Sequence, residues 1–89
     1  MISWIQLIEI TMDNTEKYKE IFIKSLSMDK NKFDDKIKYN DIPEWDSIGH
    51  MTLMSELEEE FKISMETDDI IEFSSYKKGI EILKKYKVF

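Results

Sequence analysis

The sequence of 89 residues contains no cysteine, so neither a disulfide nor a thiolate metal site can hold this small domain together. It also contains a single histidine, His50, which excludes a zinc site built from histidine and cysteine ligands. We therefore predict no metal in the fold. The domain has to be stabilised by the packing of its side chains.

Glycine and proline are scarce as well, with two and one residues respectively. Hydrophobic residues make up 42% of the chain and charged residues 36%, a balance that favours an amphipathic helical domain over disorder or a strand-rich fold. A chain of this length has room for one modest core, so we expect a single domain. The apolar opening MISWIQLIEIT lacks a basic segment, and we expect a cytoplasmic protein with neither signal peptide nor membrane span.

The charges are unevenly distributed along the chain. Residues 41–72 hold eleven acidic side chains and one lysine, a net charge of −10, whereas the remainder carries +4. The overall net charge of −6 argues against generic nucleic-acid binding, and its distribution predicts that a basic partner surface is steered to the central segment.

The hydrophobic pattern predicts a first helix over residues 14–28, capped by Asp13 or Asn14. Its inward stripe has the i, i+3, i+4 spacing and consists of Tyr18, Ile21, Phe22, Ser25 and Leu26. The segment that follows, up to residue 46, has no helical period. Its apolar residues predict a long loop pinned to the core, namely Phe33, Ile37, Tyr39, Ile42 and Trp45. Loops of this length are often functional.

A second helix is predicted over residues 47–61, with Asp46 as its N-cap. We expect its inward face to hold Ile48, Met51, Leu53, Met54 or Ser55, Leu57 and Phe61. Glu56, Glu59 and Glu60 should face water. A brief helix should follow, starting at Thr67 or Asp68 and running through Ile71.

Ser74 or Ser75 should cap the last helix, whose inward residues are expected to be Tyr76, Ile80, Leu83 and Tyr86. Gly79 in the middle of that helix costs about 1 kcal/mol relative to alanine, which predicts that a neighbouring helix packs closely against it. The predicted fold class is therefore all-α, with three main helices and one short one.

Ser47 follows the Asp46 cap at the predicted start of the second helix. Amide groups there lack helical partners, and the positive end of the helix dipole points outward. Such a position stabilises an anion, so a phosphodiester on the Ser47 oxygen would be favoured. We expect Ile48 to turn into the core and to fix the register of the turn.

These residues resemble a known family. Asp46-Ser47-Ile48, then Leu53, then the run Leu57-Glu58-Glu59-Glu60-Phe61-Lys62-Ile63 are similar to the acyl carrier proteins and peptidyl carrier domains, and the resemblance extends from about Met12 to Tyr86. It implies an acyl-carrier-like four-helix bundle over residues 12–89, preceded by an extension of residues 1–11.

In that family the serine that matches Ser47 receives 4′-phosphopantetheine from coenzyme A. A phosphopantetheinyl transferase adds the group, and its thiol then carries an acyl or aminoacyl thioester. The resemblance thus implies a monomeric carrier rather than an enzyme, served by a loading ligase and by acyl-transferring enzymes. Ser47, Asp46 and Ile48 would form the attachment site. The implied docking residues are Glu44, Trp45, Met51, Glu56, Glu59 and Glu60.

The chain departs from carriers of fatty-acid synthesis, which usually have Gly-Ala before the Asp-Ser pair and acidic residues soon after it. Here Glu44-Trp45 precede the pair and Gly49-His50-Met51-Thr52 follow it. This pattern looks more like stand-alone carriers of specialised pathways. A fatty-acid-synthesis carrier stays an alternative, and so does an unmodified acidic helical module that binds basic partners.

Several residues have a second interpretation. Asp46, Ser47 and His50 suggest a hydrolytic triad, but residues on one helical turn do not form the required line. We expect His50 to be an exposed helix residue, although it could hydrogen-bond the arm. Trp45 could anchor the loop or, if partly exposed, contact the arm or a partner enzyme.

Two further alternatives stay open. The Met and aromatic residues of the predicted helices are expected to be core, while adaptable methionines could also open a cavity for an acyl chain. At the N-terminus, Met12 could be the true start of the protein. Equally, Trp4, Ile5 and Ile8 could lengthen the first helix or mediate association.

Overall fold

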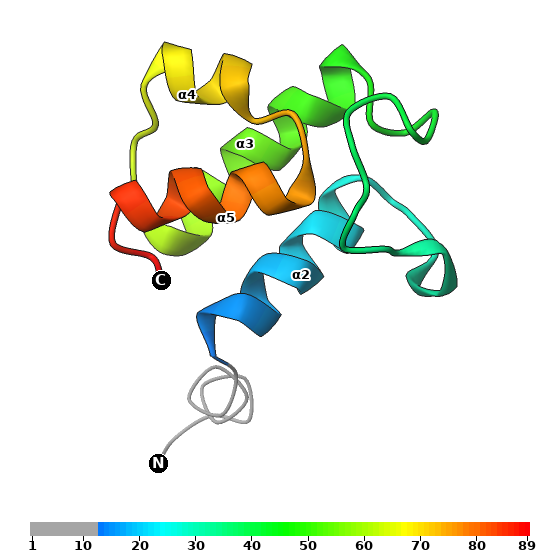
Figure 1. Cartoon of the computed structure of the whole chain (residues 1–89), viewed down its shortest axis with the longest axis horizontal. Coiled ribbons are helices and arrows are strands. Elements are labelled where there is room, and N and C mark those ends of the chain that lie inside the picture. Colours follow the sequence, from blue (N-terminus) through cyan, green and yellow to red (C-terminus); the bar gives the residue numbers. More distant parts are fainter. Residues whose placement is uncertain (1–12) are drawn as a thin grey trace.

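The computed structural model describes residues 13–89, and the regular elements within this range are helices (Figure 1). Their bounds are α2 (Asn14–Ser25), η1 (Lys30–Lys32), α3 (Ser47–Phe61), α4 (Thr67–Glu72) and α5 (Tyr76–Lys85). The strand-like pairing recorded in this range is an isolated bridge between Lys38 and Ser75. The predicted all-α class, with three main helices, one short helix and a long loop after the first, is confirmed.

Side chains at the helix ends explain the bounds of these elements. Asp13 accepts a hydrogen bond from the Glu16 amide at 2.8 Å and so caps α2. The helix ends at Ser25, three residues before the predicted end, because Ser27 adopts a left-handed φ of 50°. The bounds of α3 are those predicted. Ser75 caps α5, because its hydroxyl accepts from the Lys78 amide at 2.9 Å.

The expectations for residues 1–11 lie outside the described residues. They comprise the N-terminal extension and the proposal that Trp4, Ile5 and Ile8 lengthen the first helix.

Aromatic side chains from α2, α5 and the long loop form the centre of the core. The rings of Tyr18 and Tyr76 stack with their centroids 4.5 Å apart, and the Tyr18 hydroxyl donates to the Tyr76 carbonyl oxygen at 2.7 Å. Burial raises the pKa of Tyr18, so the hydroxyl stays a hydrogen-bond donor. Phe22 meets Trp45 edge to face at 5.0 Å. These contacts bind α2 to both the loop and α5.

The loop between α2 and α3 is fixed to the rest of the molecule, as predicted. Ile37 and Trp45 are buried in the core. The Tyr76 amide donates to the Ile37 carbonyl at 3.0 Å, and the Tyr39 amide donates to the Ser74 carbonyl at 2.9 Å. The loop is therefore held against the start of α5, and it reaches α3 in a defined conformation.

Gly79 of α5 lies against the side chain of Tyr18, which belongs to α2. A Cβ atom built on this glycine would overlap the Tyr18 hydroxyl and the Phe73 ring. The predicted close packing is thus confirmed. On the same helix Ile80 is only partly buried, and Ile82 lies deeper in the core beside Leu83.

No helix within residues 13–89 combines the length and the apolar character that a membrane crossing requires.

Candidate functional site

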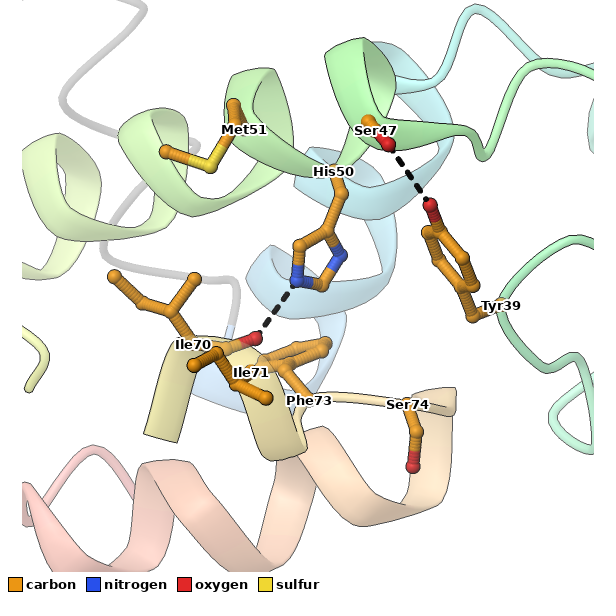
Figure 2. Close-up of a pocket in the computed structure, with 8 residues that line it drawn as sticks. All are labelled: Tyr39, Ser47, His50, Met51, Ile70, Ile71, Phe73 and Ser74. Carbon is orange, nitrogen blue, oxygen red and sulfur yellow. Dashed lines mark hydrogen bonds between the residues drawn. The ribbon is translucent and has the colours of Figure 1, made fainter. Parts of the chain in front are cut away.

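Ser47 is the first residue of α3, and it is exposed. The preceding residue, Asp46, is in extended conformation, and its carboxylate accepts a hydrogen bond from the Gly49 amide at 2.8 Å. This is the predicted N-cap. The Ser47 hydroxyl oxygen lies 3.3 Å from the hydroxyl of Tyr39, and Figure 2 shows the two groups pointing at each other.

Gly49 allows the loop to fold tightly over the first turn of α3. A Cβ atom at this position would overlap the Glu44 carbonyl oxygen. The chain also makes a turn just before the helix, closed by the Trp45 amide donating to the Ile42 carbonyl at 3.1 Å. The glycine after the Asp-Ser pair therefore sets the geometry in which the loop presents Ser47.

Tyr39 belongs to the long loop, yet its position is fixed by several contacts. Besides the bond from its amide to Ser74, its ring meets the rings of Trp45 and His50 edge to face, at centroid distances of 6.0 and 5.6 Å. The side chain is 36% exposed, with its hydroxyl beside Ser47. The loop thus places a phenol next to the serine of the second helix.

His50 connects three parts of the molecule. Its Nδ1 atom accepts a hydrogen bond from the Trp45 indole N–H at 3.0 Å, and its Nε2 atom lies 2.8 Å from the Ile70 carbonyl oxygen. Indole is only a donor and a carbonyl only an acceptor, so both bonds require the neutral ring with its proton on Nε2. The expectation of an exposed helix residue is wrong. The ring is partly buried and links α3 to the loop through Trp45 and to α4 through Ile70. Figure 2 shows the bond to Ile70.

This arrangement also bears on the triad interpretation. The two ring nitrogens of His50 are bonded to Trp45 and Ile70. The Ser47 hydroxyl is bonded instead to Tyr39. Ser47, His50 and Asp46 therefore do not form the nucleophile, base and orienting carboxylate of a hydrolytic site.

A cleft of about 320 Å³ opens beside Ser47, between α3, α4 and the loop. Its polar lining comes from Ser47, Tyr39, His50 and Ser74. Its other walls are mainly apolar, and they are formed by Met51, Ile70, Ile71 and Phe73. The cleft thus offers an apolar surface that begins at the serine hydroxyl.

The wall formed by α4 is held in place by a buried carboxylate. Asp69 is 3% exposed and accepts hydrogen bonds from the Lys85 ammonium, at 2.6 Å, and from the Tyr86 hydroxyl. These two hydrogen bonds, of which that from Lys85 has the larger effect, hold the pKa of Asp69 below its ordinary value. The Tyr86 hydroxyl in turn accepts from the Glu66 amide at 2.9 Å. The short helix is therefore anchored on α5 although no side chain caps it.

Large apolar side chains are exposed around the serine. Ile48 is 78% exposed, Met51 57% and Ile71 72%. The prediction that Ile48 turns into the core is wrong, and so is the inward placement of Met51. The core face of α3 is instead formed by Leu53, Met54 and Leu57.

The other expected docking residues differ in their placement. Glu44, Glu56, Glu59 and Glu60 are all exposed. Glu56 and Glu60 line a groove between α2 and α3, away from the cleft at Ser47. Trp45 is fully buried, and its indole N–H is taken by His50, so the prediction that it contacts partners is wrong.

The structure thus brings Ser47, Asp46 and Met51 to one end of α3. Sequence reasoning missed Tyr39 as the neighbour of Ser47, and Ser74 and the α4 residues as lining of the same cleft. Their proximity arises from the tertiary fold, and no local motif indicates it. In comparisons with protein-family models, with curated proteins and with solved structures, nothing matched this chain.

Chemically, the site offers one exposed hydroxyl at the positive end of a fifteen-residue helix, with a phenol and an apolar cleft next to it. Within residues 13–89 the side chain bonded to the Ser47 hydroxyl is the Tyr39 phenol. Another molecule can reach both the exposed hydroxyl and the adjoining cleft.

Proposed function

We propose that this chain is an acyl-carrier-like four-helix bundle that carries acyl or aminoacyl groups as thioesters. The carrying arm is 4′-phosphopantetheine, attached to the oxygen of Ser47. The observation that carries the proposal is the exposed Ser47 hydroxyl at the first residue of the capped helix α3. A phosphopantetheinyl transferase would attach the arm, and partner enzymes would load it and use its cargo.

The electrostatics of the helix start support a phosphodiester at this position. The first amides of a helix lack partners within the helix, and the helix dipole places a partial positive charge there. The Asp46 carboxylate is directed to the Gly49 amide. The oxygens of a phosphate on Ser47 would remain at the open end of the helix, in contact with water.

The surface around Ser47 supports recurrent, transient docking. Ile48 and Met51 expose apolar side chains within one turn of the serine, and Ile71 does so across the cleft. Contiguous exposed apolar surface marks interaction sites, and Met51 and Ile71 line the same cleft beside the serine. The net charge of −10 over residues 41–72 would steer a basic partner surface toward it. Asp46, Glu44 and Glu59 would contribute to this steering, whereas Glu56 and Glu60 lie farther along the α2 side.

The sequence around the site favours a specialised pathway over fatty-acid synthesis. Gly49 lets the loop pack closely on the helix, and the ring of His50 bonds to Trp45 and Ile70. They replace the acidic residues that follow the serine in fatty-acid-synthesis carriers. The loading enzyme we propose is an adenylate-forming ligase, and the protein would act in the cytoplasm as a monomer.

The test is the intact mass of the full chain after incubation with coenzyme A and a promiscuous phosphopantetheinyl transferase. The wild type should gain the mass of one phosphopantetheine group. Ser47→Ala should gain none. Ser55→Ala is the matched control, because Ser55 is also exposed on α3 but lies two turns from the helix start, and this variant should gain the group like the wild type.

The alternative from another class, an unmodified acidic interaction module, would use the same exposed apolar and acidic surface. It predicts no gain of mass in any of the three proteins. An equal gain by wild type and Ser47→Ala would also reject the carrier proposal, since the group would then sit elsewhere.

A further inference from the structure

The hydroxyl of Tyr39 is a direct neighbour of the Ser47 hydroxyl, at 3.3 Å. A phenol can donate one hydrogen bond and accept others, and so can a serine hydroxyl. In the unmodified protein either group can be the donor of this bond. The bond restrains the rotation of the serine side chain, which is otherwise exposed to water.

The main chain of the loop holds Tyr39 at this place. The Tyr39 amide donates to the Ser74 carbonyl at 2.9 Å, and the next amide, that of Asn40, donates to the Trp45 carbonyl at 3.2 Å. Asn40 adopts a left-handed φ of 70°, which reverses the chain at this point. These main-chain hydrogen bonds therefore hold Tyr39 next to the first residue of α3.

The ring of Tyr39 is held as firmly as its main chain. It packs edge to face on Trp45 and on His50, and these two rings are hydrogen-bonded to each other. Little conformational freedom is left for the phenol to lose when it makes a hydrogen bond. A preorganised donor of this kind binds a partner more effectively than a mobile one.

From this geometry we infer that Tyr39 is a positioning residue for the modification of Ser47 and a phosphate ligand in the modified protein. The inference rests on the proposed function. In the transfer step the Ser47 oxygen attacks the phosphorus of coenzyme A that bears pantetheine. A new oxygen–phosphorus bond forms, the bond from that phosphorus to the second phosphate breaks, and adenosine 3′,5′-bisphosphate leaves. The transferase accepts the serine proton.

Tyr39 has one role before the transfer and another after it. Before it, the phenol holds the serine oxygen in the orientation from which it attacks. After it, the Ser47 oxygen has lost its proton and can no longer donate, so the Tyr39 O–H is the donor of the pair. The phenol then donates to the ester or to a charged phosphate oxygen, and bonds to charged acceptors are stronger than bonds between neutral groups. Tyr39 would thus fix the start of the arm beside the cleft.

The first measurement is the rate of phosphopantetheine transfer to full-length protein, followed by intact mass. Tyr39→Phe keeps the ring and its packing but removes the hydroxyl. We expect kcat/KM for transfer to fall by about twofold to tenfold, the range that corresponds to the net contribution of one hydrogen bond. Tyr18→Phe is the control, because it removes a buried hydroxyl that is bonded to the Tyr76 carbonyl and not to Ser47, and so costs stability while the phenol beside Ser47 stays in place.

The second measurement separates a positioning role from a structural one. The phosphodiester of the modified protein gives one phosphorus NMR signal, whose chemical shift reports on hydrogen bonds to its oxygens. The shift should differ between wild type and Tyr39→Phe, and it should be the same in wild type and Tyr18→Phe. Loss of stability alone would not move it.

The outcomes distinguish this inference from the proposed function. If the wild type gains no phosphopantetheine, the proposed function itself fails. If the wild type is modified while Tyr39→Phe is modified at the same rate with an unchanged phosphorus shift, the role of Tyr39 is refuted and the carrier function stands. A slower rate in both Tyr39→Phe and Tyr18→Phe with unchanged shifts would also overturn it, since the effect would then follow stability.

Discussion

Replacing His50 with phenylalanine tests how the site is held together. The change keeps an aromatic ring against Trp45, with which His50 stacks at a centroid distance of 6.2 Å. It removes the acceptor of the Trp45 indole N–H and the donor to the Ile70 carbonyl. Helix α3 would then lose its polar links to both the loop and α4.

The size of the effect follows from these bonds. A typical hydrogen bond contributes about 0.5–1.5 kcal/mol net, and a buried donor left without a partner costs about 1–3 kcal/mol. Trp45 is fully buried, so its N–H has no access to water in the variant. We expect the free energy of unfolding to fall by about 2–4 kcal/mol, a large part of the total of about 5–15 kcal/mol for a typical domain.

The assay is urea unfolding followed by circular dichroism, carried out on His50→Phe, Trp45→Phe and the double variant. Residues in contact couple by about 0.5–3 kcal/mol, so the double variant should be less destabilised than the sum of the single ones. The reasoning is refuted if His50→Phe unfolds within about 0.5 kcal/mol of the wild type, the range of an ordinary surface substitution, or if the two effects simply add.

Three further predictions concern the fold. Gly79→Ala should lower the free energy of unfolding by about 1–3 kcal/mol, because the added methyl overlaps the buried Tyr18 and outweighs the gain in helix propensity; a more stable variant in urea unfolding would contradict this. Asp69→Asn should destabilise at pH 7. Hydrogen bonds from Lys85 and Tyr86 hold the pKa of Asp69 below its ordinary value, so its contribution is complete above the ordinary carboxyl range and declines as the pH falls through the lowered pKa of the folded state. The difference in thermal midpoint between wild type and variant should therefore narrow on acidification from pH 7, and a difference that grows instead would contradict the prediction. Ile48→Ala should change the free energy of unfolding by less than about 0.5 kcal/mol, whereas Leu53→Ala should lower it by about 2–5 kcal/mol in the same urea experiment. Equal losses of stability in the two variants would contradict the exposed placement of Ile48.

Local signals were sufficient to predict the helices. Capping residues fixed the start of each main helix, and the bounds of α3 agree at both ends. The end of α2 was predicted three residues late, because Ser27 adopts a left-handed conformation and the sequence has no glycine there to indicate a helix end. Gly79 was correctly interpreted, since a glycine in a helix needs a packing reason.

The orientation of α3 could not be predicted from its own sequence. The helix carries apolar residues on more than one face, so periodicity alone does not decide which face meets the core. Leu53 and Leu57 are buried, whereas Ile48 is exposed, and the buried side chain next to the start of the helix is Trp45, which is bonded to His50. Hydrophobic periodicity within one helix does not predict the burial of side chains whose orientation depends on a neighbouring segment.

Ser47 was chosen as the candidate residue from its motif and its place at a helix start, which are both local features. Its neighbours were not found, because the loop brings Tyr39 to it by way of bonds to Ser74 and Trp45. His50 was taken for a surface residue for the same reason. Its partners Trp45 and Ile70 come from the loop and from α4.

The most direct test of the central claim locates the modification on the chain. The full-length protein is produced together with a promiscuous phosphopantetheinyl transferase, and its proteolytic fragments are analysed by mass spectrometry. The account predicts one phosphopantetheine group on the fragment that contains Ser47, with fragmentation assigning it to that serine. An unmodified Ser47 fragment under these conditions, or the group on any other residue, would contradict it.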